Sequence, residues 1–205
     1  MSVRALIGSL AVYSVAGAAV LVAERHGDVH EPKAHSAGGT SRPGERWFAE
    51  IRGRCNPLEV TSALRDHPPP ADVTGAAYAA ACWAFAGKLD IARREISKLP
   101  TAEARVYAAS VVFYVAHPVA DHGDDVAAGP IMEFVLEFKP DDFQALYHAG
   151  MSEYALGRIA QAEQNLRKFR QLYGAKDFFG NNADQALDRI QKGLPPLVAS
   201  PGAHE

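Results

Sequence analysis

Apolar residues recur about every 3.6 positions across residues 145 to 173, a spacing typical of amphipathic α-helices. Gly157 interrupts this pattern, and the same period resumes in the residues that follow it. Small residues, among them Ala149 and Gly150, occupy positions where two helices have to approach each other. The pattern therefore predicts two amphipathic helices that fold back on each other as a hairpin, with Gly157 in the turn.

The same pattern occurs twice more upstream in the chain. Gly123 lies 36 residues after Gly87, and Gly157 lies 34 residues after Gly123. Each glycine is followed five residues later by an alanine, and each alanine four residues later by a larger apolar residue. These pairs are Ala92 and Ile96, Ala128 and Met132, and Ala162 and Leu166. Three copies in phase predict three consecutive helical hairpins.

This pattern resembles the tetratricopeptide repeat, which has a period of about 34 residues, small residues at the helix contacts and a proline after the second helix. Pro140 lies eight residues after Met132, where the family places that proline. The tryptophan and tyrosine positions of the signature hold other residues in all three copies. The resemblance implies an all-α fold of stacked antiparallel hairpins, a tetratricopeptide-like α-solenoid, over residues 45–194.

The middle copy departs most from the signature. Pro118 predicts that its first helix ends near His117, because proline lacks the N–H that continues a helix. Gly129 and Pro130 predict that its second helix begins late, which would leave a long loop between the two helices. Among later helix starts, Asp141 is the expected cap after Pro140, and Asn181 or Asn182 the expected cap of a last helix that covers the stack.

The amino-terminal segment is apolar. Residues 5–23 carry no charge and are long enough, as a helix, to span a bilayer core of about 30 Å. We expect residues 1–23 to form a signal-anchor or transmembrane helix; the alternative is a signal peptide cleaved near residues 16–18. Both interpretations place the rest of the chain outside the cytoplasm, either anchored in the periplasm or at the cell surface, or secreted. Residues 24–44 are expected to be a flexible linker, and residues 195–205 a disordered tail.

Charge and cysteine content narrow the possible partners. The net charge is −3, and no basic face is evident, so nucleic acid is not expected as a partner. Cys55 and Cys82 are too few for a disulfide-built miniprotein or a zinc ribbon. Stacking of adjacent hairpins can bring them together across the connection formed by residues 68–70, and export would allow a disulfide. The alternative is two buried free thiols.

No enzyme signature is present in the sequence. It contains no nucleophile elbow and no glycine-rich phosphate loop, so we expect neither catalysis nor a cofactor. The densest polar cluster comprises His117, Asp121, His122, Asp124 and Asp125. Its spacing matches neither a paired-histidine zinc motif nor a calcium loop, so no bound metal is expected, although a metal-dependent enzyme or regulator using this loop is the main alternative function.

The resemblance also implies where a partner would bind. In the repeat family, the first helix of each hairpin lines a concave groove. Alignment on the glycines places the following residues along it: Tyr78, Phe113, Tyr114, His117, Asp121, Tyr147, His148 and Met151. The alternative is that several of these rings pack between helices, as aromatic residues at helical spacing often do. We therefore expect a membrane-tethered adaptor that binds a protein or peptide, with a fixed structural subunit of a membrane complex as a further alternative.

Overall fold

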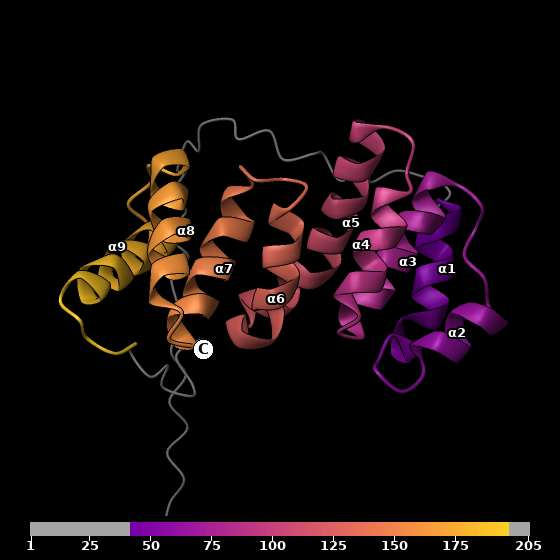
Figure 1. Ribbon diagram of the computed structural model, residues 1–205, viewed down its shortest axis with the longest axis horizontal. Helices are drawn as coiled ribbons and strands as arrows, with labels where there is room; N and C mark the ends of the chain where they lie inside the picture. The colour runs from indigo at the N-terminus through magenta and orange to yellow at the C-terminus, as the bar shows by residue number, and fades with distance from the viewer. Residues whose placement is uncertain (1–41, 197–205) are drawn as a thin grey trace, which may run out of the picture. The chain divides into compact units, whose positions relative to one another are not determined.

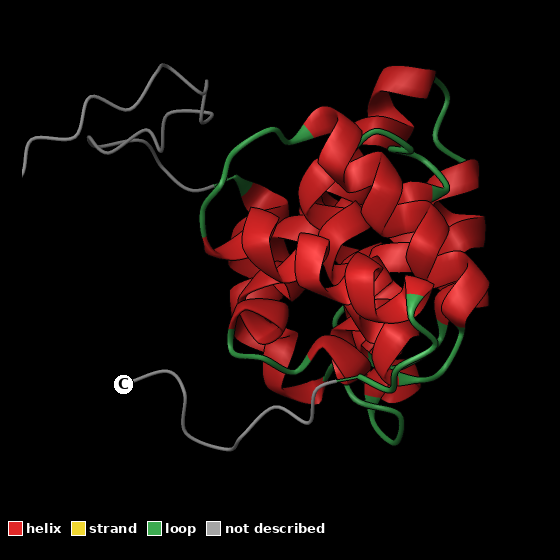
Figure 2. Cartoon of the chain, turned by 90° about the vertical axis from the view of Figure 1, so that its left-hand side faces the viewer, coloured by secondary structure: helices red, strands yellow, loops and turns green. Residues whose placement is uncertain are grey.

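The computed structural model describes residues 42–196, and within this range the regular secondary structure is helical, with no strand (Figures 1 and 2). The prediction of an all-α fold is thereby confirmed for these residues. The helices are α1 (Pro43–Ile51), the short turn η1 (Arg52–Arg54), α2 (Val60–Asp66), α3 (Val73–Phe85), α4 (Leu89–Ser97), α5 (Ala102–Asp121), α6 (Asp125–Leu136), α7 (Phe143–Ala155), α8 (Ile159–Leu172) and α9 (Phe178–Gln191). The expected anchor, most of the expected linker and most of the expected tail lie outside the described residues.

Glycines in the left-handed backbone conformation close the three hairpins. Helix α3 packs on α4, α5 on α6, and α7 on α8, and the turns contain Gly87, Gly123 and Gly157 at φ 68°, 84° and 75°. A side chain is strained at such angles, so only glycine fits readily at the end of each first helix. Gly193, at φ 63°, ends α9 in the same way, 36 residues after Gly157. The spacing of about 34 to 36 residues between these glycines therefore extends to α9, the helix that follows the third hairpin.

Contacts between successive hairpins differ along the domain. Helix α3 packs against both α1 and α5, so the first helices of neighbouring units lie side by side (Figure 1). Helix α7 instead packs closely on α6 and makes few backbone approaches to α5. Between the second hairpin (α5 and α6) and the third (α7 and α8), α5 and the turn that joins α6 to α7 therefore border an open space.

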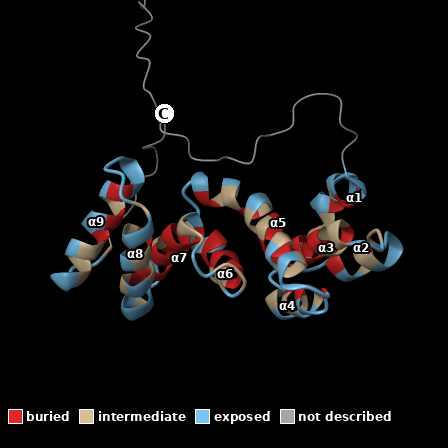
Figure 3. Ribbon diagram, turned by 90° about the horizontal axis from the view of Figure 1, so that it is seen from above, coloured by how far each residue is buried: buried red, intermediate tan, exposed pale blue. Residues whose placement is uncertain are grey.

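Three apolar clusters hold the helices together. One joins α3 to α6, a second joins α7, α8 and α9, and a third joins α1, α2 and α3. Helix α7 contributes to two of them, because Ala145 and Ala149 face the first cluster and Leu146 and Tyr154 face the second. Figure 3 shows buried residues concentrated along α3 and α7, whereas α8 and α9 present exposed outer faces.

The middle hairpin corrects the expectation of a long loop. Helix α5 passes through Pro118 and ends at Asp121, and α6 already begins at Asp125, so only residues 122–124 connect them. Pro118 and Tyr114 are both exposed, so water can bond the carbonyl group that the proline leaves without its helical donor. The buried alanines on the opposite face keep the last turn packed. Pro130 is likewise exposed within α6.

Two of the expected helix caps are also wrong. The backbone N–H of Ala145 donates to the carboxylate of Asp142, 3.1 Å away, so Asp142 rather than Asp141 caps α7. Asp177 accepts from the N–H of Gly180 at 3.0 Å and caps α9, which therefore begins before Asn181. A capping side chain has to precede the N–H group that it accepts from by two or three residues. The residue at which each helix begins therefore decides which side chain can cap it.

Replacement of Gly129 by alanine is expected to destabilise the domain. Gly129 of α6 lies against Ser152 of α7, and an added Cβ would lie 1.9 Å from the Ser152 Oγ atom. Both residues are buried, and this Oγ has no hydrogen-bond partner among the described residues. Overpacking costs about 1–3 kcal/mol, enough to exceed the gain of up to about 1 kcal/mol from helix propensity. Urea denaturation of Gly129→Ala should show the loss.

The matched control removes the obstructing side chain. If the close approach causes the loss, adding Ser152→Gly should restore part of the stability of Gly129→Ala, although glycine alone weakens a helix. Additive losses in the double variant would contradict the assigned contact.

Candidate functional site

The residues predicted to line a groove have very different exposures. Tyr114 is 74% exposed and Asp121 is also exposed, whereas Tyr147 and His148 are only 6% and 3% exposed. The remaining four are partly buried: Tyr78, Phe113, His117 and Met151. Of the eight, therefore, Tyr114 and Asp121 present most surface to solvent.

Tyr147 lies within the packed end of the domain. Its ring centroid lies 5.3 Å from those of Phe169 in α8 and Phe179 in α9, so it is surrounded by the second apolar cluster. The Asn182 side-chain amide donates to its hydroxyl at 3.4 Å. The ring thus fills the space between three helices.

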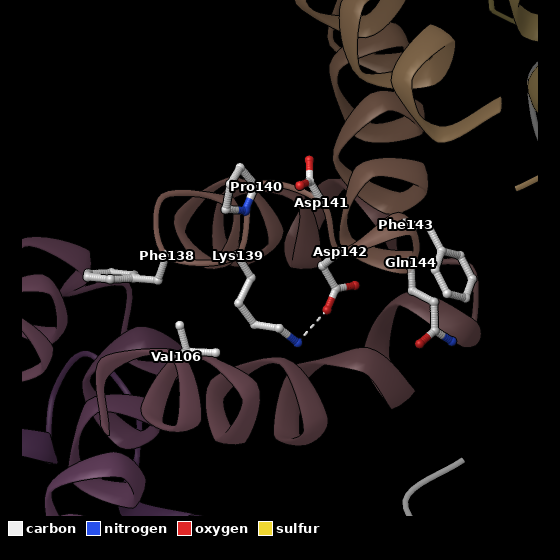
Figure 4. A pocket seen from close by; sticks show the side chains of 8 residues that line it. All are labelled: Val106, Phe138, Lys139, Pro140, Asp141, Asp142, Phe143 and Gln144. Atoms are coloured by element: carbon white, nitrogen blue, oxygen red, sulfur yellow. Dashed lines mark hydrogen bonds and ion pairs between the residues drawn. The ribbon is translucent and has the colours of Figure 1, made fainter. Parts of the chain in front are cut away.

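An open hollow lies between α5 and the turn that joins α6 to α7 (Figure 4). Its lining is Val106, Phe138, Lys139, Pro140, Asp141, Asp142, Phe143 and Gln144. Lys139 points toward Asp142, with Nζ 2.6 Å from a carboxylate oxygen, and the same Nζ lies 5.7 Å from the ring centroid of Phe113. The hollow offers apolar carbon together with charges of both signs. None of its lining residues was among the predicted groove residues, because most of them belong to a turn rather than to a first helix.

A compact group of two imidazoles and one carboxylate joins α5 to α7. His117 Nδ1 lies 3.3 Å from Asp121 Oδ2, and His148 Nε2 lies 3.6 Å from Asp121 Oδ1. One ligand atom from each of the three residues fits within 4.8 Å of the others. His117 and Asp121 share one face of α5 because they are four residues apart.

Aromatic contacts hold both imidazoles in place. The His117 ring packs 4.7 Å from Phe113 and 5.1 Å from His148, and the His148 ring packs 5.1 Å from Tyr147. Burial lowers the pKa of the His117 imidazole, and its neighbour His148 lowers it further, although the Asp121 carboxylate acts in the opposite direction. The neutral form of His117 is therefore favoured, and this is the form that binds metals.

His122 and Asp124 of the predicted polar cluster do not join this group. The His122 imidazole donates to the carbonyl oxygen of Pro118 one turn earlier. Asp124 caps α6 by accepting from the N–H of Ala127 at 3.0 Å. His117 and Asp121 are thus the described members of the predicted cluster that lie beside His148.

Cys55 and Cys82 form a disulfide, with their Cα atoms 4.8 Å apart. Both residues are buried in the cluster that joins α1, α2 and α3. The bond connects the segment after η1 to the last turn of α3, across the proline-rich connection.

A separate polar cluster lies between α6, α7 and α8. Arg158 pairs with Glu133, and the Asn165 side-chain amide donates to Glu153 at 2.9 Å. Burial raises the pKa of the Glu153 carboxyl group, and the hydrogen bond from Asn165 partly offsets this rise. The two pairs link α6 to the start of α8 and α7 to α8, while the buried Arg158 Nε has no hydrogen-bond partner among the described residues, and we assign the cluster a packing role.

No protein family, curated protein or solved structure was found to match the chain. Within residues 42–196, none of the helices combines the length and apolar character needed to cross a bilayer. The class that the structure itself defines is a helical domain of consecutive hairpins.

Proposed function

We propose that this protein is a tetratricopeptide-like adaptor that binds a segment of another protein, and that it is held at a membrane by residues 1–23. The observation that carries the proposal is the repetition of Gly87, Gly123 and Gly157 in the left-handed conformation, each at the end of the first helix of a hairpin. Equal turns at nearly equal spacing favour a stack of similar units, and such stacks present extended binding surfaces. Such an architecture supports a role in binding another protein.

The hollow beside α5 is the surface that we assign to the partner. It combines the exposed side chain of Val106 with Phe138, Lys139 and Asp141, and so suits a peptide that carries one apolar residue beside a charged group. We add Tyr114 to the proposed surface: it does not line the hollow, but it exposes its ring on the same helix, and exposed tyrosines are common anchors at interfaces. Tyr114 is the predicted groove residue best placed to contact a partner.

Location outside the cytoplasm is supported by two features. The disulfide between Cys55 and Cys82 is of a kind that persists mainly in oxidising compartments. The uncharged run at residues 5–23 supplies either an anchor or an export signal. The proposal therefore extends to a periplasmic or cell-surface position, with secretion after cleavage as the alternative.

Crosslinking from position 114 tests the proposed partner site. A photoreactive amino acid in place of Tyr114, in the native host, should give discrete covalent adducts, whereas the same residue in place of the 93% exposed Leu58 should not. Excess unlabelled wild-type protein should compete for the adduct, and Tyr114→Ala should compete at least tenfold less well. Equal adducts from both positions, or equal competition by wild type and variant, would contradict the proposed surface.

A further inference from the structure

We propose that His117, Asp121 and His148 form a binding site for one zinc ion that joins α5 to α7. The two residues of α5 are one helical turn apart, and His148 comes from a helix that otherwise makes few backbone approaches to α5. The site is independent of the proposed partner surface and goes beyond it.

The separations within the group agree with tetrahedral zinc. Zinc–ligand bonds of about 2.0–2.1 Å place neighbouring ligand atoms about 3.3 Å apart in a tetrahedron. The two observed nitrogen–oxygen separations are 3.3 Å from His117 Nδ1 to Asp121 Oδ2 and 3.6 Å from His148 Nε2 to Asp121 Oδ1, both close to this edge length. They end on different oxygens of the carboxylate, so one oxygen has to turn toward both nitrogens when a metal binds. The third separation is no more than 4.8 Å. The Asp121 and His117 side chains, 41% and 21% exposed, are the ones that have to turn to bring the three ligand atoms to this spacing.

The donor types select the class of metal. Two imidazole nitrogens and one carboxylate oxygen suit zinc and neighbouring transition metals, whereas calcium and magnesium require sets made almost entirely of oxygen atoms. Three protein ligands leave the fourth tetrahedral position to water or to a group from a partner. The Asp121 side chain is 41% exposed, so this position is accessible from solvent.

The surroundings favour a rigid site. The His148 side chain is only 4% exposed and packs edge-on against the Tyr147 ring, so its orientation is fixed before a metal arrives. Phe113 packs against His117 on the same helix. With His148 already fixed, only the two side chains of α5 have to reorganise on binding, which favours metal affinity. A bound ion would also hold α5 and α7 at a fixed distance.

The experiment uses the full chain without a polyhistidine tag, freed of metal by a chelator and titrated with zinc against a chromophoric indicator. Wild-type protein should bind one equivalent that His117→Ala and Asp121→Asn each weaken at least a hundredfold. His122→Ala is the matched control, because His122 lies on the same segment but outside the group, and should bind as wild type. The comparison also separates this site from the three histidines of residues 24–44.

Two further measurements make the result decisive. Cobalt substitution in wild-type protein should produce the intense visible absorption of a four-coordinate ion, and Asp121→Asn should abolish it. Melting curves of the metal-free variants establish that both remain folded, as the partial exposure of the two side chains leads us to expect. Equal zinc affinity in wild type, His117→Ala and Asp121→Asn, or loss of binding in His122→Ala alone, would overturn the proposal.

Discussion

Reduction of the Cys55–Cys82 disulfide is expected to lower the free energy of unfolding by roughly 3 to 4 kcal/mol in the chain-entropy model. The bond closes a loop between residues 27 positions apart, and so removes much of the freedom of the unfolded chain. The bond also ties the segment that follows α1 and η1 to α3, on which α1 mainly packs. Urea denaturation of the wild-type protein with and without a reductant measures it.

The matched control is the double variant Cys55→Ala with Cys82→Ala, whose stability should not respond to the reductant. Thiol titration of the denatured, unreduced wild-type protein should detect no free thiol. Two free thiols, or equal stability of the oxidised and reduced wild type, would contradict this prediction.

Truncation of Tyr147 to alanine is expected to cost roughly 3 to 5 kcal/mol, comparable with other large aromatic truncations in protein cores. The ring is 6% exposed and lies against Phe169 and Phe179, so its removal would leave a cavity between α7, α8 and α9. The midpoint of urea unfolding should fall accordingly.

Tyr147→Phe is the control for this change. It removes only the hydroxyl group that Asn182 contacts at 3.4 Å, so we expect a loss of less than about 1.5 kcal/mol. If Tyr147→Ala instead melted like the wild type while partner binding fell, Tyr147 would act as a groove contact rather than as a core residue.

Local chemistry made the hairpin turns predictable. The left-handed backbone angle of a turn favours glycine whatever the surrounding packing. The positions of the turns at Gly87, Gly123 and Gly157 could therefore be predicted from their spacing alone. The helix boundaries near Pro118 and Pro130 were not. Both prolines lie on exposed helix faces, and burial of the opposite face outweighs the lost hydrogen bond. That balance depends on tertiary packing, which the sequence does not display.

The same error hid the imidazole–carboxylate group. With α5 ended at His117, the spacing of four residues to Asp121 could not be recognised as one helix face. Alignment on the glycines also sets His148 level with Tyr114, because each lies nine residues before the glycine of its own hairpin, and not with His117. In the structure the His117 and His148 rings are in contact, at 5.1 Å. The relative orientation of α5 and α7 determines whether the two rings come into contact. This orientation cannot be predicted from the local sequence. A prediction that α5 continues through Pro118 would have placed His117 and Asp121 on one helix face and so indicated part of the group.

The double role of α7 has a consequence for cooperativity. Ala145 and Ala149 belong to the apolar cluster of the preceding helices, and Leu146 and Tyr154 to that of the following ones. Melting either cluster would expose one face of α7 to water while its other face remained packed. The two halves of the domain are therefore energetically linked through α7, together with Leu136 of α6, which also packs against both clusters, so local unfolding of one half is expected to weaken the other.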